Sequence, residues 1–181
     1  HPLIWSVYPA YSNKRFSKHI IFKTSSTIKV VLTNMNSETP PLLTYLEKKG
    51  ISLEDLINTA LELFVPHPGL DTEEKAAEML REEFLDALSD VNVSCLEVAC
   101  FRAQEDAENG LIPGLSKERF MGRPGLVADE LLGLAITNYI AVVRGVFEFT
   151  RFDQAKPGIL KKLGPIANDA IGGLVAGVSS N

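Results

Sequence analysis

Cysteine is scarce in this sequence, with only 2 among 181 residues. That is too few for the disulfide framework that stabilises many small secreted domains. Cys95 and Cys100 lie in a predicted helix, where a spacing of five turns their side chains about 140° apart and disfavours a bridge between them. We therefore expect two reduced thiols in the core of a cytoplasmic protein.

The sequence also lacks a long uncharged apolar run. The best candidate, residues 126–147, is interrupted by Asp129, Glu130, Asn138 and Arg144. A transmembrane helix needs about 20 predominantly apolar residues, and charged side chains inside the membrane are costly. We therefore expect no transmembrane segment.

An excess of basic residues is absent as well. The net charge is −5, which disfavours nucleic acid as a partner. The charge is uneven, because residues 1–34 contain five basic and no acidic side chains, which leaves −10 for residues 35–181. The composition, 45% hydrophobic and 23% charged, is typical of a globular protein.

Residues 1–39 show no clear pattern beyond two stretches, 19–22 and 27–32, that are compatible with strands. We expect a loosely attached N-terminal extension of uncertain structure. The length of the remainder suits one domain with a substantial core, so residues 40–181 are predicted to form a single helical domain.

From residue 40 onward, helix signals dominate. Pro40-Pro41 opens and Gly50 closes a short helix, and Ser52 with Asp55 forms a capping box for the next. Helical spacing predicts longer helices over 71–89 and 92–108. The fold class is therefore all-α, a compact bundle of about six or seven helices. Its Gly-rich apolar helices are compatible with a homodimer.

The predicted helix 92–108 carries several charged side chains. We expect these to form pairs at the surface rather than a site: Glu97, Arg102, Glu105, Asp106 and Glu108.

Three short acidic clusters interrupt apolar sequence in the last third of the chain. They are Asp129-Glu130, Asp153 and Asn168-Asp169. Carboxylates are rarely buried unless they are paired or bind metal. Each cluster also has a plainer interpretation, because acidic residues are favourable at helix starts. Asp153 in particular could cap a short helix over 158–163.

Lys156 and Arg151 flank the second cluster, and Lys156 precedes Pro157, so we expect an extended backbone at Lys156. Carboxylate and amide oxygens suit Mg²⁺, and cationic side chains suit phosphate. The small residues after Asp169 would let the last helix approach its neighbours closely. Together these features are suggestive of a magnesium and phosphate site, with a small phosphorylated molecule as the ligand.

The same residues carry a resemblance to a known family. The three motifs read Val127-Ala-Asp129-Glu130-Leu-Leu-Gly133, then Phe149-Thr-Arg-Phe-Asp153-Gln-Ala-Lys156-Pro157, then Asn168-Asp169-Ala-Ile-Gly-Gly173. Their order and spacing resemble the phosphatidylglycerophosphatase A family over about residues 40–178. The chain is more similar to the soluble branch, which includes archaeal alpha-ribazole phosphatases of cobalamin biosynthesis.

The resemblance implies an all-helical, Mg²⁺-dependent hydrolase of phosphate monoesters. It implies that Asp129, Glu130 and Asp169 are metal ligands or water activators, that Asp153 supports the site, and that Lys156 binds phosphate. The chain departs from the family where Asn168 replaces the first Asp of the final pair. Asn168 keeps an oxygen ligand for the metal but removes a negative charge.

Several functions remain open at this point. The favoured substrate is alpha-ribazole 5′-phosphate. Phosphatidylglycerophosphate, a substrate of lipid metabolism, is second. A non-catalytic helical binding module with a decayed site is an alternative, and so is a structural protein whose carboxylates are helix caps. The last alternative requires Asp129, Asp153 and Asp169 to lie far apart.

Overall fold

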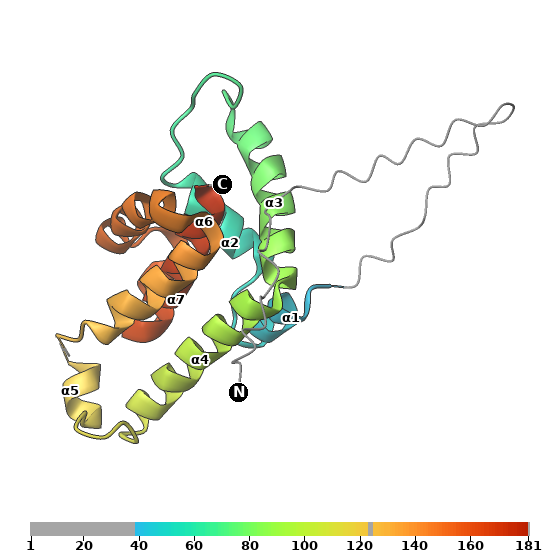
Figure 1. Cartoon of the computed structure of the whole chain (residues 1–181). Coiled ribbons are helices and arrows are strands. Elements are labelled where there is room, and N and C mark those ends of the chain that lie inside the picture. Colours follow the sequence, from blue (N-terminus) through green and yellow to red (C-terminus); the bar gives the residue numbers. More distant parts are fainter. Residues whose placement is uncertain (1–38, 123–124, 181) are drawn as a thin grey trace, which may run out of the picture. The chain divides into compact units, whose positions relative to one another are not determined.

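A computed structural model describes residues 39–122 and 125–180 of the chain. Within these ranges it contains seven α-helices, one 3₁₀ helix (η1) and no strand, which confirms the predicted all-α class (Figure 1). The interpretation of residues 1–38 as a loosely attached extension lies outside the described residues. The elements are α1 (Pro41–Lys48), α2 (Leu53–Leu61), α3 (Glu73–Ser89), α4 (Val91–Glu108), α5 (Lys117–Met121), α6 (Ala128–Ala155), η1 (Gly158–Lys162) and α7 (Pro165–Ser179).

Local sequence signals explain the starts of the first helices. Pro41 occupies the first turn of α1, where its missing N–H costs nothing. Ser52 and Asp55 form the predicted capping box of α2, with reciprocal bonds between side chain and backbone. Gly50 between these helices has a φ of 80°, a conformation that glycine adopts without steric cost.

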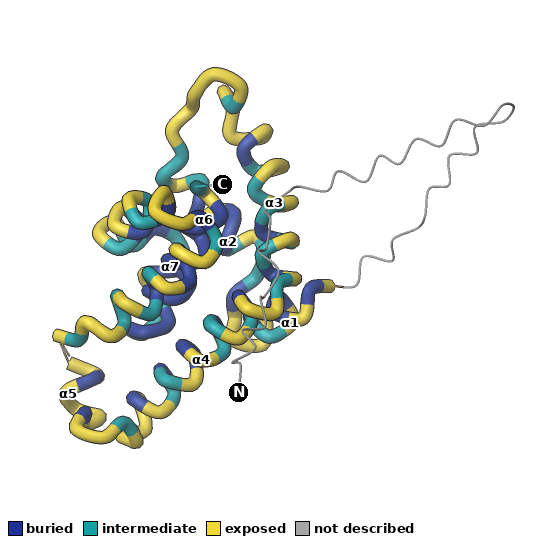
Figure 2. The backbone as a smooth tube through the Cα atoms, viewed as in Figure 1, coloured by how far each residue is buried: buried dark blue, intermediate teal, exposed yellow. Residues whose placement is uncertain are grey.

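Helix α7 lies at the centre of the described bundle. Every residue from Ile166 to Val178 is buried except Asn168, which is intermediate, and the α7 tube is mostly dark blue in Figure 2. Helices α2, α3, α4 and α6 all pack against it. A helix that is apolar all round is stable only when it is covered on all sides, so α7 forms the axis of the core.

Helix α6 is longer than predicted and is sharply bent. The sequence pattern predicted a helix over 127–147, but the helical assignment continues to Ala155, across non-helical backbone at Val142 (φ 54°, ψ −145°). Residues 128–141 form a first arm and residues 143–155 a second arm. A Cβ built on Gly145 would lie 2.4 Å from Thr137 Cγ2, so the second arm folds back along the first (Figure 1).

Glycines allow α6 and α7 to touch through their backbones. A Cβ at Gly173 would lie 2.3 Å from the carbonyl oxygen of Gly133, and one at Gly177 would lie 2.8 Å from Ile140. The Thr137 hydroxyl donates to the Gly173 carbonyl at 3.0 Å. The predicted close approach of the Gly-rich last helix is therefore confirmed, and it brings the start of α7 beside both arms of α6.

Two predictions about α4 are wrong. Cys100 is buried, but Cys95 is exposed, because the divergence that keeps the thiols apart allows only one of them to face the core. Glu97 was expected at the surface, yet it is fully buried. It lies on the same face as Val93, Cys100 and Phe101, where its position on the helix outweighs its charge. The Arg102–Glu105 surface pair is present at 2.9 Å.

Candidate metal centre

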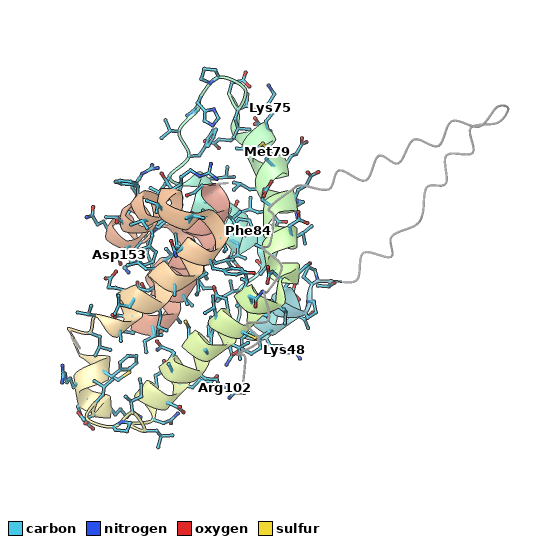
Figure 3. The ribbon with its side chains drawn as sticks, in the orientation of Figure 1. Lys48, Lys75, Met79, Phe84, Arg102 and Asp153 are labelled. Atoms are coloured by element: carbon cyan, nitrogen blue, oxygen red, sulfur yellow. The ribbon has the colours of Figure 1, made fainter. Side chains whose placement is uncertain are left out.

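Three carboxylates from three separate helical segments meet at one point. Glu130 comes from the first arm of α6, Asp153 from the second arm (Figure 3) and Asp169 from α7. Each offers one oxygen, and these oxygens all lie within 4.8 Å of one another. We call these three residues the acidic cluster. Among the described residues it is the one such group of potential metal-ligating side chains.

The bend at Val142 creates this cluster. In a straight α-helix, Glu130 and Asp153 would be separated by roughly 35 Å along the axis, because each residue adds about 1.5 Å. Their carboxylates are neighbours only because the second arm reverses direction. The hydrophobic pattern alone could not have revealed this reversal, since both arms have ordinary helical periodicity.

Lys156 supplies the positive charge beside the acidic cluster. Its ammonium donates to Asp169 at 2.7 Å and also to Asp153 and Asn168. The prediction of extended backbone at Lys156 is wrong, because this residue is the left-handed C-cap of α6 (φ 44°, ψ 53°). The left-handed conformation ends the second arm and still avoids the right-handed helical region that Pro157 disfavours.

The acidic cluster carries more negative charge than Lys156 can balance. Burial raises the pKa of Asp169 above its usual value, and although Lys156 opposes this, the pKa stays raised. Burial, followed by the charges of Asp169 and Asp153, likewise raises the pKa of Glu130. Burial alone would lower the pKa of Lys156, but its bonds to Asp153 and Asp169 raise it. A cation bound among these carboxylates would relieve the excess negative charge.

Lys156 and Asp169 form an ion pair, yet both of their pKa values are raised. The raised pKa of Lys156 indicates a strong attraction, whereas the raised pKa of Asp169 indicates a carboxylate in an unfavourable place. Both follow from the geometry, because one ammonium is shared among several acceptors while Asp169 is only 3% exposed.

The other two predicted ligands lie next to the acidic cluster. Asp129 adds negative charge that raises the pKa of both Glu130 and Asp169, while one of its oxygens accepts the Glu130 backbone N–H at 3.0 Å. The amide oxygen of Asn168 accepts from Lys156, and its nitrogen donates to the Gly164 carbonyl at 3.1 Å. An aspartate could not make this second bond, so Asn168 is well fitted to its place.

Arg151 makes its hydrogen bonds to groups outside the acidic cluster. Its guanidinium donates to Glu148 at 2.8 and 2.7 Å and to the Leu63 carbonyl at 2.9 Å. It lines a mainly apolar cavity of about 290 Å³ together with Phe64 and Met79. Arg151 was predicted to bind phosphate beside Lys156, and this role stays a prediction.

Asp153 has a more central position in the cluster than was predicted from the sequence. It was given a supporting role or the role of a cap for the short helix after Pro157. However, η1 has no side-chain cap, and Asp153 instead joins Glu130 and Asp169. The available signal was its spacing of three from Lys156, which places the two on one side of a continuing helix.

The donor set fits a hard divalent cation. All three members of the acidic cluster offer carboxylate oxygen, the ligand type that Mg²⁺ and Ca²⁺ prefer. Mg²⁺ keeps several water molecules and is commonly held by a few carboxylates together with substrate phosphate. A purely structural protein required Asp129, Asp153 and Asp169 to lie far apart. Asp153 and Asp169 instead belong to one cluster, and Asp129 is near enough for its charge to raise the pKa of Asp169.

Comparisons with known proteins agree on the fold and give no information about activity. No protein-family model matches the chain. The low temperature requirement C protein of Listeria monocytogenes has a TM-score of 0.65 at 24% identity, covering 79% of this chain and 95% of that one. The ypjQ protein of Bacillus subtilis has a TM-score of 0.61 at 22% identity, covering 77% and 88%. Likeness at this identity shows the shared fold alone.

A relative at higher identity comes from an archaeon. The uncharacterised protein MJ1330 of Methanocaldococcus jannaschii is 36% identical over an alignment of 112 residues that covers 59% of this chain and 85% of that protein. This identity extends over most of the archaeal protein. The chain therefore belongs to the same family as MJ1330.

Proposed function

We propose that the protein is a Mg²⁺-dependent hydrolase of phosphate monoesters. The observation that carries this proposal is the convergence of Glu130, Asp153 and Asp169 on one point, with Lys156 bound to two of them. Several carboxylates together can hold Mg²⁺, and an adjacent ammonium can hold phosphate oxygens. The resemblance to the phosphatidylglycerophosphatase A family rests on the same residues and supports the same chemistry.

The residues of the site have distinct tasks in this proposal. Bound Mg²⁺ would supply Lewis acidity toward the phosphoryl group and an activated water. Asp153 and Asp169 hold the cation, and Lys156 turns from these carboxylates toward the phosphate of the substrate. Glu130 accepts one proton from the attacking water, whose oxygen bonds to phosphorus as the bond to the ester oxygen breaks, and returns that proton to the leaving alcohol, while Asp129 adds negative charge beside Glu130. The raised pKa of Glu130 makes it a better base than an ordinary carboxylate.

The substrate is proposed from the resemblance. Alpha-ribazole 5′-phosphate is the favoured candidate, and phosphatidylglycerophosphate is second. The bound cation and Lys156 would recognise the phosphoryl group that both compounds share, so the leaving group must be identified by experiment. The cytoplasmic location and the homodimer likewise stay proposals.

One observation favours a second candidate, a non-catalytic helical module. Lys156 already donates to Asp153, Asn168 and Asp169, so the cluster is partly satisfied without any ligand. In this reading Asn168 marks a decayed site. Substitution of Asn168 by Asp would then create phosphatase activity where the natural chain has none.

A phosphatase screen tests the two candidates. Purified protein is incubated with Mg²⁺ and alpha-ribazole 5′-phosphate, phosphatidylglycerophosphate or simple nucleotides, and released phosphate is measured. We expect hydrolysis of one class of monoester, lost in EDTA and restored by Mg²⁺. Full activity in EDTA would rule out the metal mechanism. No activity, together with no heat of Mg²⁺ binding by calorimetry, would favour the non-catalytic module.

A further inference from the structure

Two buried polar side chains outside the acidic cluster hold the backbone that connects Lys156 to Asp169. Thr59 on α2 is fully buried and Gln104 on α4 is 6% exposed. Each contacts one end of the segment that contains η1. Buried polar groups are costly unless they are hydrogen-bonded, and the oxygen of each side chain accepts backbone N–H groups of this segment.

Thr59 holds the turn that follows Lys156. Its hydroxyl accepts the Ile159 backbone N–H at 3.1 Å and donates to the Asp55 carbonyl at 2.6 Å. The turn presses so closely on α2 that a Cβ at Gly158 would lie 2.2 Å from the Thr59 hydroxyl oxygen. With a φ of 52°, Gly158 also needs the conformational freedom of glycine. The turn is thus fixed two residues after Lys156.

Gln104 holds the start of α7. Its side-chain oxygen accepts the backbone N–H groups of Ile166 at 3.0 Å and Ala167 at 3.2 Å, and its amide donates to Glu108 at 2.6 Å. Helix α7 has no side-chain cap of its own, so Gln104 satisfies N–H groups that a helix start leaves unpaired. A Cβ at Gly164 would lie 1.9 Å from the Gln104 amide nitrogen.

These contacts fix both ends of the segment in the same manner, with a buried polar side chain pressed against a glycine. Lys156 lies just before the first of these ends and Asp169 just after the second, and their side chains meet at 2.7 Å. Electrostatic interaction at such short range changes strongly with distance, and active-site geometry tolerates little displacement. The arrangement of the acidic cluster around Lys156 therefore depends on two residues that do not touch it.

We propose that Thr59 and Gln104 are positioning residues that hold Lys156 and Asp169 in their relative places for the proposed phosphatase site. The inference rests on the proposed function for its catalytic consequence. The positioning itself is a property of the fold and is measurable without substrate or metal.

The test compares variants that lose the hydrogen bond with variants that keep it. Thr59→Val removes the hydroxyl at nearly constant volume, and Thr59→Ser retains it; Thr59→Ala replaces the valine variant if that does not fold. Gln104→Met removes the cap of α7, whereas Gln104→Glu combined with Glu108→Gln exchanges the two groups and retains it. Leu88→Ala, a core substitution in α3, serves as the control for general loss of stability.

The first readout is amide hydrogen exchange at Lys156 and Asp169, residues whose own N–H groups do not bond to Thr59 or Gln104. Loss of one net hydrogen bond corresponds to about three- to tenfold faster opening. We expect that increase at Lys156 in Thr59→Val and at Asp169 in Gln104→Met, relative to the change in the rest of the chain. Both bond-retaining variants should exchange at the natural rate.

The second readout is phosphate release in the presence of Mg²⁺, where kcat should fall about tenfold or more in the bond-losing variants and recover in the bond-retaining ones. The proposal is overturned if exchange rises at these two amides no more than in Leu88→Ala, or if Thr59→Ser behaves like Thr59→Val. If the natural chain hydrolyses no phosphate ester, the exchange result alone decides the positioning role.

Discussion

Two buried carboxyl groups in this protein have opposite surroundings. Asp169 at the start of α7 is 3% exposed and is bonded to Lys156. Glu97 in the middle of α4 is 0% exposed, and neither of its oxygens has a hydrogen-bond partner within the described parts of the chain. Burial raises the pKa of Asp169 against the opposing effect of Lys156, while burial alone raises the pKa of Glu97 to about 8.

The difference shows which carboxyl group remains available as a charge. Asp169 has the Lys156 ammonium and two carboxylates as neighbours, so the ammonium favours its ionised form. Glu97 has no hydrogen-bond partner among the described residues, and it lies close to the thiol of Cys100, whose own pKa is raised to about 12 by burial and by Glu97. A buried charge without a partner is unfavourable, so Glu97 is protonated at neutral pH and acts as a core residue.

The first prediction has the largest expected effect and compares the phosphatase activity of variants at Asp169 and at Glu97. Asp169→Asn removes one member of the acidic cluster, and we expect phosphate release with Mg²⁺ to fall by about 10²–10³-fold. Glu97→Gln and the exposed-surface variant Asp86→Asn should retain the natural rate. If Glu97→Gln and Asp169→Asn lose equal phosphatase activity while both remain folded by circular dichroism, the site does not lie at the acidic cluster.

The second prediction concerns stability and pH at Glu97. Below pH 4.5 the carboxyl is protonated in both the folded and unfolded chain. Between about 4.5 and 8 only the unfolded chain releases the proton, so the free energy of unfolding falls as pH rises, and above 8 the full penalty is present. Glu97→Gln should therefore raise this free energy by roughly 2–4 kcal/mol at pH 8.5 and change it little at pH 4.5.

Urea titrations at the two pH values measure this effect. The exposed variant Glu78→Gln is the matched control and should show no pH-dependent gain. A Glu97→Gln protein that is less stable than the natural chain at pH 8.5 would mean that Glu97 has a bonding partner in solution.

The third prediction concerns the charge balance of the acidic cluster. Lys156→Met leaves Asp153 and Asp169 without their ammonium, which should lower the free energy of unfolding by about 1–3 kcal/mol. The loss is moderated by solvent, because the Lys156 side chain is 35% exposed. Mg²⁺ should restore more of the melting temperature in this variant than it adds to the natural chain, because the cation replaces the missing positive charge.

Thermal unfolding with and without millimolar Mg²⁺ provides the measurement. Lys161→Met, whose side chain is 62% exposed and 3.7 Å from Glu62, should change little. Insensitivity of Lys156→Met to Mg²⁺ would argue that Lys156 and the carboxylates form a structural pair.

Sequence pattern predicted the fold class and the cluster's members better than it predicted their arrangement. Helical periodicity and the Ser52–Asp55 capping box are local signals, and the structure follows them. Asp129, Glu130 and Asp169 were singled out because carboxylates in apolar sequence need an explanation. The family resemblance placed Glu130 and Asp153 in one site, but helical periodicity could not, since their convergence depends on a reversal of direction inside one apolar helix.

The remaining misses have a common cause. Glu97, Gln104 and Thr59 are polar residues that are buried in the structure, and tertiary packing sets their burial. The left-handed conformation of Lys156 was also hidden, because the restriction before Pro157 is usually met by extended backbone. In each case the position on the helix or turn, fixed by long-range contacts, outweighed the local preference.

The smallest expected effect concerns the bend that assembles the site. Val142 has a φ of 54° and a ψ of −145°, a region that β-branched residues adopt only under strain of about 1–3 kcal/mol. Val142→Gly should relieve this strain. Because Val142 is 59% exposed, little packing is lost, and we expect a net gain of about 1 kcal/mol in the free energy of unfolding.

The control is Val143→Gly, one position later in helical backbone, which should instead destabilise by about 1 kcal/mol. Chemical denaturation of the two variants measures the difference. If Val142→Gly loses as much stability as Val143→Gly, α6 is straight at this point in solution, and Glu130 and Asp153 of one chain cannot belong to one site.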